Sequence, residues 1–320
     1  MLCLGIEATA HTFGVGIAAA DGRMLANVKK TYLPKIGSGL VPREARDHHR
    51  RVADGLIADA LAAADCTMED IDVLSFSQGP GLPPCLHVGK DVVTRLAKQY
   101  KKSIVPVNHC IAHIEIGRQQ TGLGDPMTVY VSGANTQVIG FANGRYRVFG
   151  ETQDIGIGNA LDKLGRTLGL PFPAGPEIEN LAKKGSWTTL PYSVKGMDLA
   201  FSGILTAAEK KQGSKENVCF SFQETTFAMV TEVTERAVAH TGKEAVLLTG
   251  GVAANKRLQK MLQTMCTERG ARFAVVPAPY AMDNGAMIAW TGLIMHKKTK
   301  PGTLTILPRQ RTDDVPVTWR

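Results

Sequence analysis

The chain has 320 residues, of which 44% are hydrophobic and 21% charged, so it is long enough for two domains or one large domain with a sizeable core. Lysine and arginine number 37 against 29 aspartate and glutamate, and the net charge of +8 fits either a polyanionic partner or a soluble basic surface. No apolar run or leader-like pattern predicts a membrane span or a signal peptide, and the six cysteines are irregularly spaced, so we expect a cytoplasmic protein without a disulfide framework.

The first hundred residues predict an α/β arrangement. Residues 2–30 alternate as strand, polar turn, strand, Asp21-Gly22 turn and strand, which is the pattern of hairpins. An apolar strand over 72–77 then leads through a glycine turn into a helical pattern from about Val88 to Tyr100. Buried strands followed by helical crossovers are typical of covered α/β sheets.

Two histidines follow, four residues apart. On a helix His109 and His113 share one face and can reach a single metal ion, although two ordinary surface histidines would give the same spacing. A zinc-peptidase helix carries glutamate directly after the first histidine, where this chain has Cys110. Glu115 lies elsewhere on the helix, so the peptidase interpretation lacks its base.

The second half repeats the first. Residues 127–151 again give strand, small-residue turn, strand, Asn143-Gly144 turn and strand, and the two turns, at Gly22 and Gly144, are 122 residues apart. Residues 245–249 lead through Gly250-Gly251 into a helical pattern from about Asn255 to Glu268. The repetition predicts two related lobes, 1–124 and 125–320. The polar stretch 308–320 is expected to lie along the surface or cross back to the first lobe.

Several small or acidic residues follow these strands. Glycine-containing turns at 132–134 and 250–251 can bring backbone amides to a phosphate, and no GxxxxGK[ST] loop occurs. Asp162 and Glu179 lie on predicted helices beside glycine-rich loops, where they either hold ribose hydroxyls or face solvent. Asp283 precedes a predicted helix over 286–295, as a metal ligand or a helix cap.

Six motifs occur together and in order: GIEATAHTFGVGI, the HxxxH helix, YVSGANTQ, NALDKLGR with PAGPEIE, LLTGGVAAN and MDNGAMIAW. Together they resemble the universal tRNA threonylcarbamoyltransferase family, in its archaeal form as the catalytic subunit of the KEOPS complex, a family formerly described as sialoglycoprotein endopeptidases. The resemblance covers essentially the whole chain. It implies an actin/hexokinase-like (ASKHA) α/β fold of two duplicated lobes, with the active site in the cleft between them.

The resemblance also implies the ligands of the site. One divalent metal ion, with iron favoured and zinc possible, would be held by His109, His113, Tyr130 and Asp283. Threonylcarbamoyl-AMP, AMP or ATP would contact a further set: Tyr130, Val131, Ser132, Gly133, Ala134, Asp162, Gly175, Glu179 and Asn255.

The implied reaction joins two substrates. A separate adenylate-forming synthase supplies threonylcarbamoyl-AMP, and the acceptor is the adenosine following the anticodon in tRNAs that read codons beginning with adenine. AMP is released. KEOPS subunits, including a small atypical kinase, are the expected partners, and no membrane is involved. Glu7 and His11 are candidates for the general base, although Glu7 can instead orient its neighbours. Basic residues at Arg46, Arg50, Arg51 and Lys98 are candidates for tRNA phosphate contacts, or solvated helix faces.

Two other functions remain open at this point. A small-molecule kinase of the same fold would transfer a phosphoryl group, and the HxxxH pair is unexpected in such an enzyme. A non-catalytic nucleotide-binding scaffold would bind ATP and partners, and it would not need His109.

Overall fold

The structure is a computed structural model that describes residues 1–34, 40–296 and 304–320. The chain forms two compact units: unit 1 comprises residues 1–120, 142–146 and 283–320, and unit 2 comprises 121–141 and 147–282. The predicted single boundary near residue 124 divides the chain once. In the structure the chain passes from one unit to the other several times, because residues 142–146 and 283–320 both belong to unit 1.

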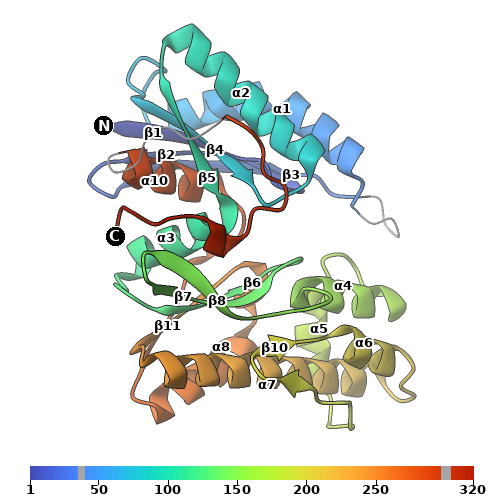
Figure 1. Ribbon diagram of the computed structural model, residues 1–320. Helices are drawn as coiled ribbons and strands as arrows, with labels where there is room; N and C mark the ends of the chain where they lie inside the picture. Colours follow the sequence, from blue (N-terminus) through green and yellow to red (C-terminus); the bar gives the residue numbers. More distant parts are fainter. Residues whose placement is uncertain (35–39, 297–303) are drawn as a thin grey trace. The chain divides into compact units, whose positions relative to one another are not determined.

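Unit 1 is built on a five-stranded sheet of order β3-β2-β1-β4-β5 (Figure 1). The strands are β1 (Leu2–Glu7), β2 (Thr12–Ala19), β3 (Met24–Thr31), β4 (Val73–Gly79) and β5 (Ser103–Asn108). The first three pair antiparallel as a meander, while β4 and β5 run parallel to β1. Gly22 has φ +93° in the predicted β2–β3 turn, a conformation that glycine adopts without strain.

The second sheet has the order β12-β11-β6-β7-β8, and it repeats the topology of the first strand for strand. Its strands are β6 (Met127–Val131), β7 (Thr136–Ala142), β8 (Arg145–Glu151), β11 (Ala245–Thr249) and β12 (Arg272–Val275). Here β6 pairs antiparallel with β7, and β11 runs parallel to both β6 and β12. Asn143 and Gly144 both have positive φ, as the predicted hairpin turn requires. The predicted duplication is confirmed.

Helices cover both faces of the first sheet. Helices α1 (Pro42–Ala63) and α2 (Pro83–Tyr100) pack on the face that carries Leu4 and Ile6, and α10 (Gly285–His296) packs on the opposite face (Figure 1). Because strand residues alternate in direction, Cys3 and Gly5 face α10. Helix α3 (His109–Thr121) begins directly after β5.

Glycines let α10 lie unusually close to the sheet. A Cβ atom at Gly5 would stand 2.1 Å from the Ala289 nitrogen, and one at Gly16 would stand 2.2 Å from the Ala286 nitrogen. A Cβ atom at Gly285 would likewise stand 2.2 Å from the Gly16 nitrogen. No side chain fits at these three positions, so backbone packing fixes where α10 begins and therefore where Asp283 lies.

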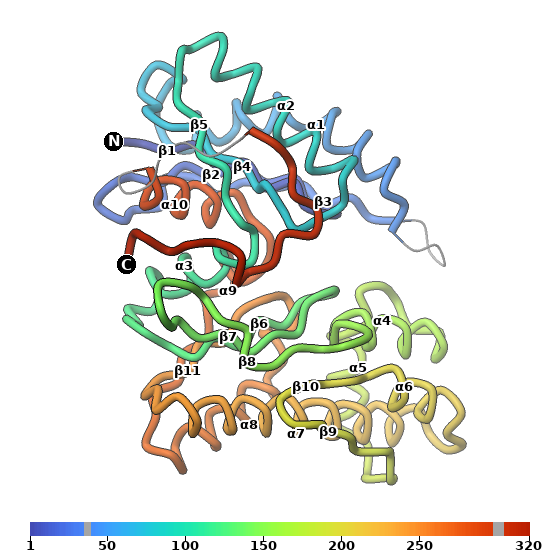
Figure 2. Tube along the Cα trace, viewed as in Figure 1, coloured from blue at the N-terminus to red at the C-terminus, as the bar shows by residue number. Residues whose placement is uncertain are grey.

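The C-terminal residues 304–320 also belong to unit 1 and run past β4, β5 and the start of α3 (Figure 2). The Leu307 amide donates to the Gln78 carbonyl at 2.8 Å, and the Asn108 side chain donates to Gln310 at 3.1 Å. The stretch 308–320 was expected to lie along the surface or to cross back, and these contacts join it to unit 1.

Unit 2 buries a large core between its sheet and helices, and a smaller cluster of Leu123, Ala245, Leu247, Val276 and Ala281 is buried separately. The helices are α4 (Ile157–Thr167), α5 (Gly175–Ala182), α6 (Ser202–Glu209), α7 (Lys215–Thr241), α8 (Lys256–Glu268) and α9 (Ala278–Ala281), with the short strands β9 (Val194–Lys195) and β10 (Asp198–Leu199). Single 3₁₀ turns cover Gly251–Ala254 in unit 2 and Thr312–Asp314 in unit 1. Among the described residues, no helix combines the length and apolar character that crossing a membrane requires.

Candidate metal and nucleotide sites

Helix α3 carries both predicted histidines on one face. Asn108 ends β5, and its side-chain oxygen accepts from the Ile111 amide at 3.1 Å, which caps the first turn of the helix. The ring centroids of His109 and His113 are 4.8 Å apart with planes at 85°, and both side chains are buried. The surface-histidine alternative is therefore excluded by burial.

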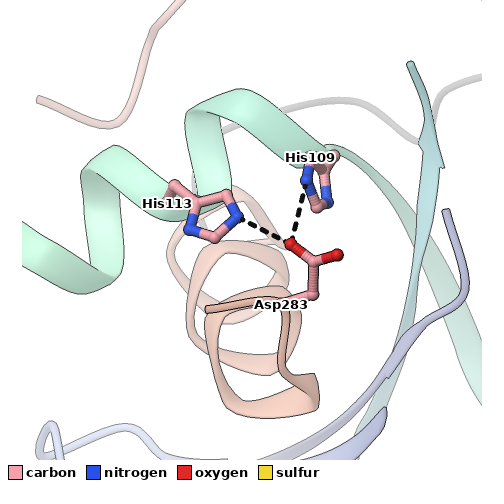
Figure 3. A group of neighbouring side chains, drawn as sticks. All are labelled: His109, His113 and Asp283. Atoms are coloured by element: carbon pink, nitrogen blue, oxygen red, sulfur yellow. Dashed lines mark hydrogen bonds and ion pairs between the residues drawn. The ribbon is translucent and has the colours of Figure 1, made fainter. Parts of the chain in front are cut away.

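Asp283 meets these histidines from the start of α10. Its Oδ1 lies 3.3 Å from His113 Nε2 and 3.6 Å from His109 Nε2, and the three ligand atoms fall within 4.8 Å of one another (Figure 3). The neighbouring Asn284 caps the helix instead, because its side chain accepts from the Met287 amide at 2.9 Å. The carboxylate of Asp283 therefore contacts the histidines and does not cap the helix.

Glu7 fixes the orientation of His109. Its Oε2 lies 2.9 Å from His109 Nδ1, while Oε1 accepts from the amide and hydroxyl of Thr9 at 2.7 and 2.5 Å. Glu7 is fully buried. A carboxylate on Nδ1 places the proton there and leaves Nε2 as the ligand atom, an arrangement common around metal-bound histidines.

The charges of the group are strongly coupled. Burial lowers the pKa of His109, but the carboxylates of Glu7 and Asp283 outweigh burial and raise it to about 9. Burial also lowers the pKa of His113, and there it prevails. Burial alone would raise the pKa of Asp283, yet the hydrogen bond from His113 and the charges of neighbouring histidines hold it well below its ordinary range. Two imidazoles beside an ionised carboxylate form a donor set that suits iron or zinc.

Tyr130, the fourth ligand implied by the resemblance, lies in the middle of the second sheet. It is the fourth residue of β6, it belongs to unit 2 and it is fully buried. The three ligands described above all belong to unit 1.

Glycine-rich turns gather at the end of β6 in unit 2. The amides of Gly158 and Asn159 donate to the carbonyls of Ser132 and Gly133 at 3.1 and 2.9 Å, which joins the 132–135 turn to the start of α4. Gly250, with φ +99°, lies so close to β6 that a Cβ would stand 2.1 Å from the Val131 carbonyl oxygen. The predicted turns at 132–134 and 250–251 therefore both lie at the end of β6 in unit 2.

The other residues implied for the nucleotide make local contacts in unit 2. Asp162 accepts from the Ala174 amide at 2.7 Å, and Glu179 accepts from the Lys256 amide at 2.8 Å. Asn255 is buried and caps α8 through bonds from Arg257 and Leu258. Gly175 opens α5, and a side chain there would meet no atom within 4 Å. Glu179 and Asn255 are thereby held near one another at the start of α8.

Two residues that were not among the predicted site residues lie directly beside them in the structure. Thr9 donates two hydrogen bonds to Glu7, and Asn159 is an exposed residue whose Oδ1 would lie 3.1 Å from a Cβ at Gly133. The glycine pair just before Asn159 was visible in the sequence. No short-range signal marked Thr9, because its role depends on the two residues it joins.

The remaining candidates lie in unit 1. His11 is half-buried between β1 and β2, and its charge contributes to the lowered pKa of Asp283. Arg46 pairs with Asp47 at 2.8 Å, while Arg50 and Arg51 are exposed on α1. Lys98 is exposed on α2, beside Arg95 and Asp91 in a shallow pocket.

Comparison with solved structures defines the class of fold. The protein is similar to HypF from T. kodakarensis, with a TM-score of 0.67 and 14% identity over 92% of this chain and 48% of that chain. It is also similar to the ROK hexokinase from Thermus thermophilus, with a TM-score of 0.53 and 14% identity over 93% and 99%. The chain therefore has the expected two-lobed actin/hexokinase-like α/β fold.

Comparison of sequences then gives the family. Residues 23–290 match the family model described as tRNA N6-adenosine threonylcarbamoyltransferase. The chain is 53% identical to the protein of that name from Thermococcus kodakarensis, over 100% of both chains. It is 51% identical to a probable bifunctional tRNA threonylcarbamoyladenosine biosynthesis protein from Methanocaldococcus jannaschii, of which it covers 60%. The chain belongs to the tRNA N6-adenosine threonylcarbamoyltransferase family.

Proposed function

We propose that this protein transfers the threonylcarbamoyl group of threonylcarbamoyl-AMP to N6 of the adenosine following the anticodon, in tRNAs that read codons beginning with adenine. The observation that carries the proposal beyond family membership is the buried group of His109, His113 and Asp283, whose ligand atoms lie within 4.8 Å of one another. A small-molecule kinase needs no such group. The reaction makes one N–C bond, breaks the bond between the carbamoyl carbon and the phosphate oxygen, and releases AMP and a proton.

The residues have separate tasks in this reaction. His109, His113 and Asp283, with Tyr130 as the implied fourth ligand, would hold one iron or zinc ion, which when bound supplies Lewis-acid stabilisation of the phosphate. Because the Ser132 amide already donates to the Asn135 carbonyl at 2.8 Å, the backbone amides of Gly133 and Ala134 are the ones that orient the nucleotide phosphate and any developing oxyanion. Asp162, Gly175, Glu179 and Asn255 then bind the nucleoside part of the donor.

Glu7 serves as an orienting group rather than as the general base. Both its oxygens are engaged, one with His109 and the other with Thr9, and its side chain is closed to solvent. A base must reach the amine that it deprotonates. His11 remains the candidate for that role, since it is half-buried and has a protonatable nitrogen near Asp283.

We further propose that the protein works in the cytoplasm with the other KEOPS subunits, among them a small atypical kinase. A relative of which this chain covers 60% is named bifunctional, which supports a second activity that works together with the transferase. The donor comes from an adenylate-forming synthase, because a mixed anhydride must be made from threonine, bicarbonate and ATP.

The test is reconstitution with mass spectrometry of nucleosides. Unmodified tRNA is incubated with the protein, the synthase, its substrates and the KEOPS partners. We expect threonylcarbamoyladenosine with the wild type and its loss with His109→Ala/His113→Ala. His87→Ala is the matched control, because His87 is exposed on α2 outside the group.

Each outcome has a definite meaning. Product formed by the double variant at the wild-type rate would show that the histidines are not needed. No product from the wild type, with every partner shown to be active, would overturn the transferase proposal. The kinase and scaffold alternatives would then be the ones to test.

A further inference from the structure

Three exposed segments of unit 2 meet on one surface. They are the end of α4 (166–168), the loop after α5 (183–189) and the link between α6 and α7 (209–217). Lys215 donates to the Leu168 carbonyl at 2.6 Å, and Thr167 donates to Glu209 at 2.9 Å. These bonds join the first segment to the third.

The loop after α5 is joined to the same link. Lys211 donates to the Thr189 carbonyl at 3.1 Å, and the Ser186 amide donates to the Asn217 side chain at 2.8 Å. Gly185 lies so close to α7 that a Cβ there would stand 2.2 Å from the Glu216 carbonyl oxygen. We call the surface formed by these three segments the α4–α7 surface.

Positive charge is concentrated there. The three segments carry six basic side chains against two acidic ones, Glu209 and Glu216, so their net charge is +4, half of the +8 of the whole chain. Of the six basic side chains, Lys211 is half-buried and the other five are exposed. The basic residues of the α4–α7 surface are Arg166, Lys183, Lys184, Lys210, Lys211 and Lys215.

Helix α1 offers a useful contrast. Its four arginines, among them the predicted RNA contacts Arg46, Arg50 and Arg51, are matched by four acidic residues of the same helix, so it carries no net charge from these groups. Its Arg46 is already paired with Asp47. Attraction for a polyanion depends on unbalanced charge, which favours the α4–α7 surface over α1.

An exposed tryptophan stands among these lysines. Trp187 is 55% exposed, although tryptophan is largely buried in most proteins. Its backbone is held on both sides, because Ser186 bonds to Asn217 and the Thr188 amide donates to Ser221 at 2.7 Å. The indole is therefore presented on a fixed loop rather than on a freely moving one.

We propose that the α4–α7 surface binds RNA, with lysines on backbone phosphates and Trp187 stacked on an unpaired base. Basic groups interleaved with an aromatic ring are how proteins hold single-stranded and loop nucleotides. An acidic protein would use the lysines but gives the tryptophan no comparable partner. The inference rests on the proposed function, because a transferase that modifies tRNA beside the anticodon must hold an RNA loop.

The experiment measures binding of a labelled, unmodified tRNA transcript by the full chain over a range of salt concentrations. Lys184→Gln/Lys210→Gln removes two exposed charges, and we expect weaker binding with a salt slope lower by about 1.5, as for two lost phosphate contacts. Lys260→Gln/Arg272→Gln removes equal charge from exposed positions on α8 and β12 and should leave binding near the wild-type value.

The aromatic part has its own test. Trp187→Ala should weaken binding about tenfold with an unchanged salt slope, and Trp187→Phe should restore most of it. Equal behaviour of the two charge variants, or RNA binding that is indifferent to Trp187→Ala, would overturn the proposal. These readouts need no catalysis, so RNA binding without product formation would contradict the proposed function alone.

Discussion

Glu7 shows how a residue's neighbours decide its role. Its contacts with His109 and Thr9 make it a positioning group, so Glu7→Gln should lower Zn²⁺ affinity about 10- to 100-fold by weakening the hold on the imidazole. Titration calorimetry on metal-free protein measures this. Glu69→Gln, an exposed change in the same unit, is the control. Unchanged affinity in Glu7→Gln would mean that the Glu7–His109 bond has no part in metal binding.

His49 gives a prediction for acid stability. It is buried beside Phe13 and His48, and burial together with the charges of His48 and His11 lowers its pKa to about 4. Between about pH 6.5 and 4 the His49 imidazole is therefore protonated in the unfolded chain but neutral in the folded protein. Above this window His49 is neutral in both states and costs no stability. As the pH falls through the window, the free energy of unfolding decreases by up to about 3 kcal/mol.

The measurement for His49 compares two proteins. Urea unfolding of wild type and His49→Gln at several pH values should show a shallower loss of unfolding free energy for the variant between pH 6.5 and 4. Parallel curves would mean that the buried imidazole does not titrate in this window.

At the scale of elements, the contact of α10 with the first sheet depends on glycine. Gly16→Ala places a methyl group 2.2 Å from a backbone nitrogen and should destabilise the protein by roughly 1–3 kcal/mol, or more if the helix cannot shift. Gly55→Ala is the matched change, since Gly55 lies within α1 with no atom near its Cβ position. It should stabilise by up to about 1 kcal/mol. Thermal unfolding distinguishes the two.

A second element-scale contact ties α3 to the C-terminal residues. The buried carboxylate of Glu115 accepts from Tyr146 at 2.7 Å and from the Trp319 indole at 2.8 Å, and it pairs with Arg118. Arg320 lies over the Tyr146 ring, 5.6 Å from its centre. Glu115, which the peptidase interpretation could not use as a base, thus joins residues 304–320 to the helix that carries His109 and His113.

The hydrogen bond from Tyr146 to the buried carboxylate of Glu115 should contribute more to the free energy of unfolding than a similar bond at an exposed position. Tyr146→Phe removes a donor from Glu115 and should cost about 1.5–3 kcal/mol of unfolding free energy. Tyr192→Phe removes a hydroxyl bonded to Glu232 at an exposed position and should cost under about 0.5 kcal/mol. Equal losses for the two variants would refute the role given to Glu115.

Much of this could be predicted from local pattern. Alternation and the Asp21-Gly22 and Asn143-Gly144 turns located both meanders, and the HxxxH spacing located the helix of the site. The approach of Asp283 to the histidines was not readable from spacing, because it depends on Gly5, Gly16 and Gly285 letting α10 onto the sheet. The family resemblance supplied that residue, and the packing explains it.

At the scale of the whole molecule, unit 1 is assembled from separate stretches of chain. The sequence predicted this only in part: a return of residues 308–320 to the first lobe was one of two expectations, whereas no pattern linked the helix that follows Asp283 to the first sheet. A fragment of residues 1–124 leaves the glycine-lined face of its sheet without α10. We expect that fragment to lack cooperative unfolding in calorimetry, and we expect residues 283–320, joined by a linker, to restore it. Cooperative unfolding of the bare fragment would show that α10 is dispensable.

The discontinuity also sets a schedule for protein synthesis. His113 and Asp283 are 170 positions apart, so at roughly 5–20 residues per second the ribosome delivers the carboxylate some 10–30 s after the histidine. Until then the nascent chain holds the two imidazoles and Glu7 without the carboxylate of Asp283. An ion that uses all three side chains could therefore be bound only after residue 283 has been synthesised.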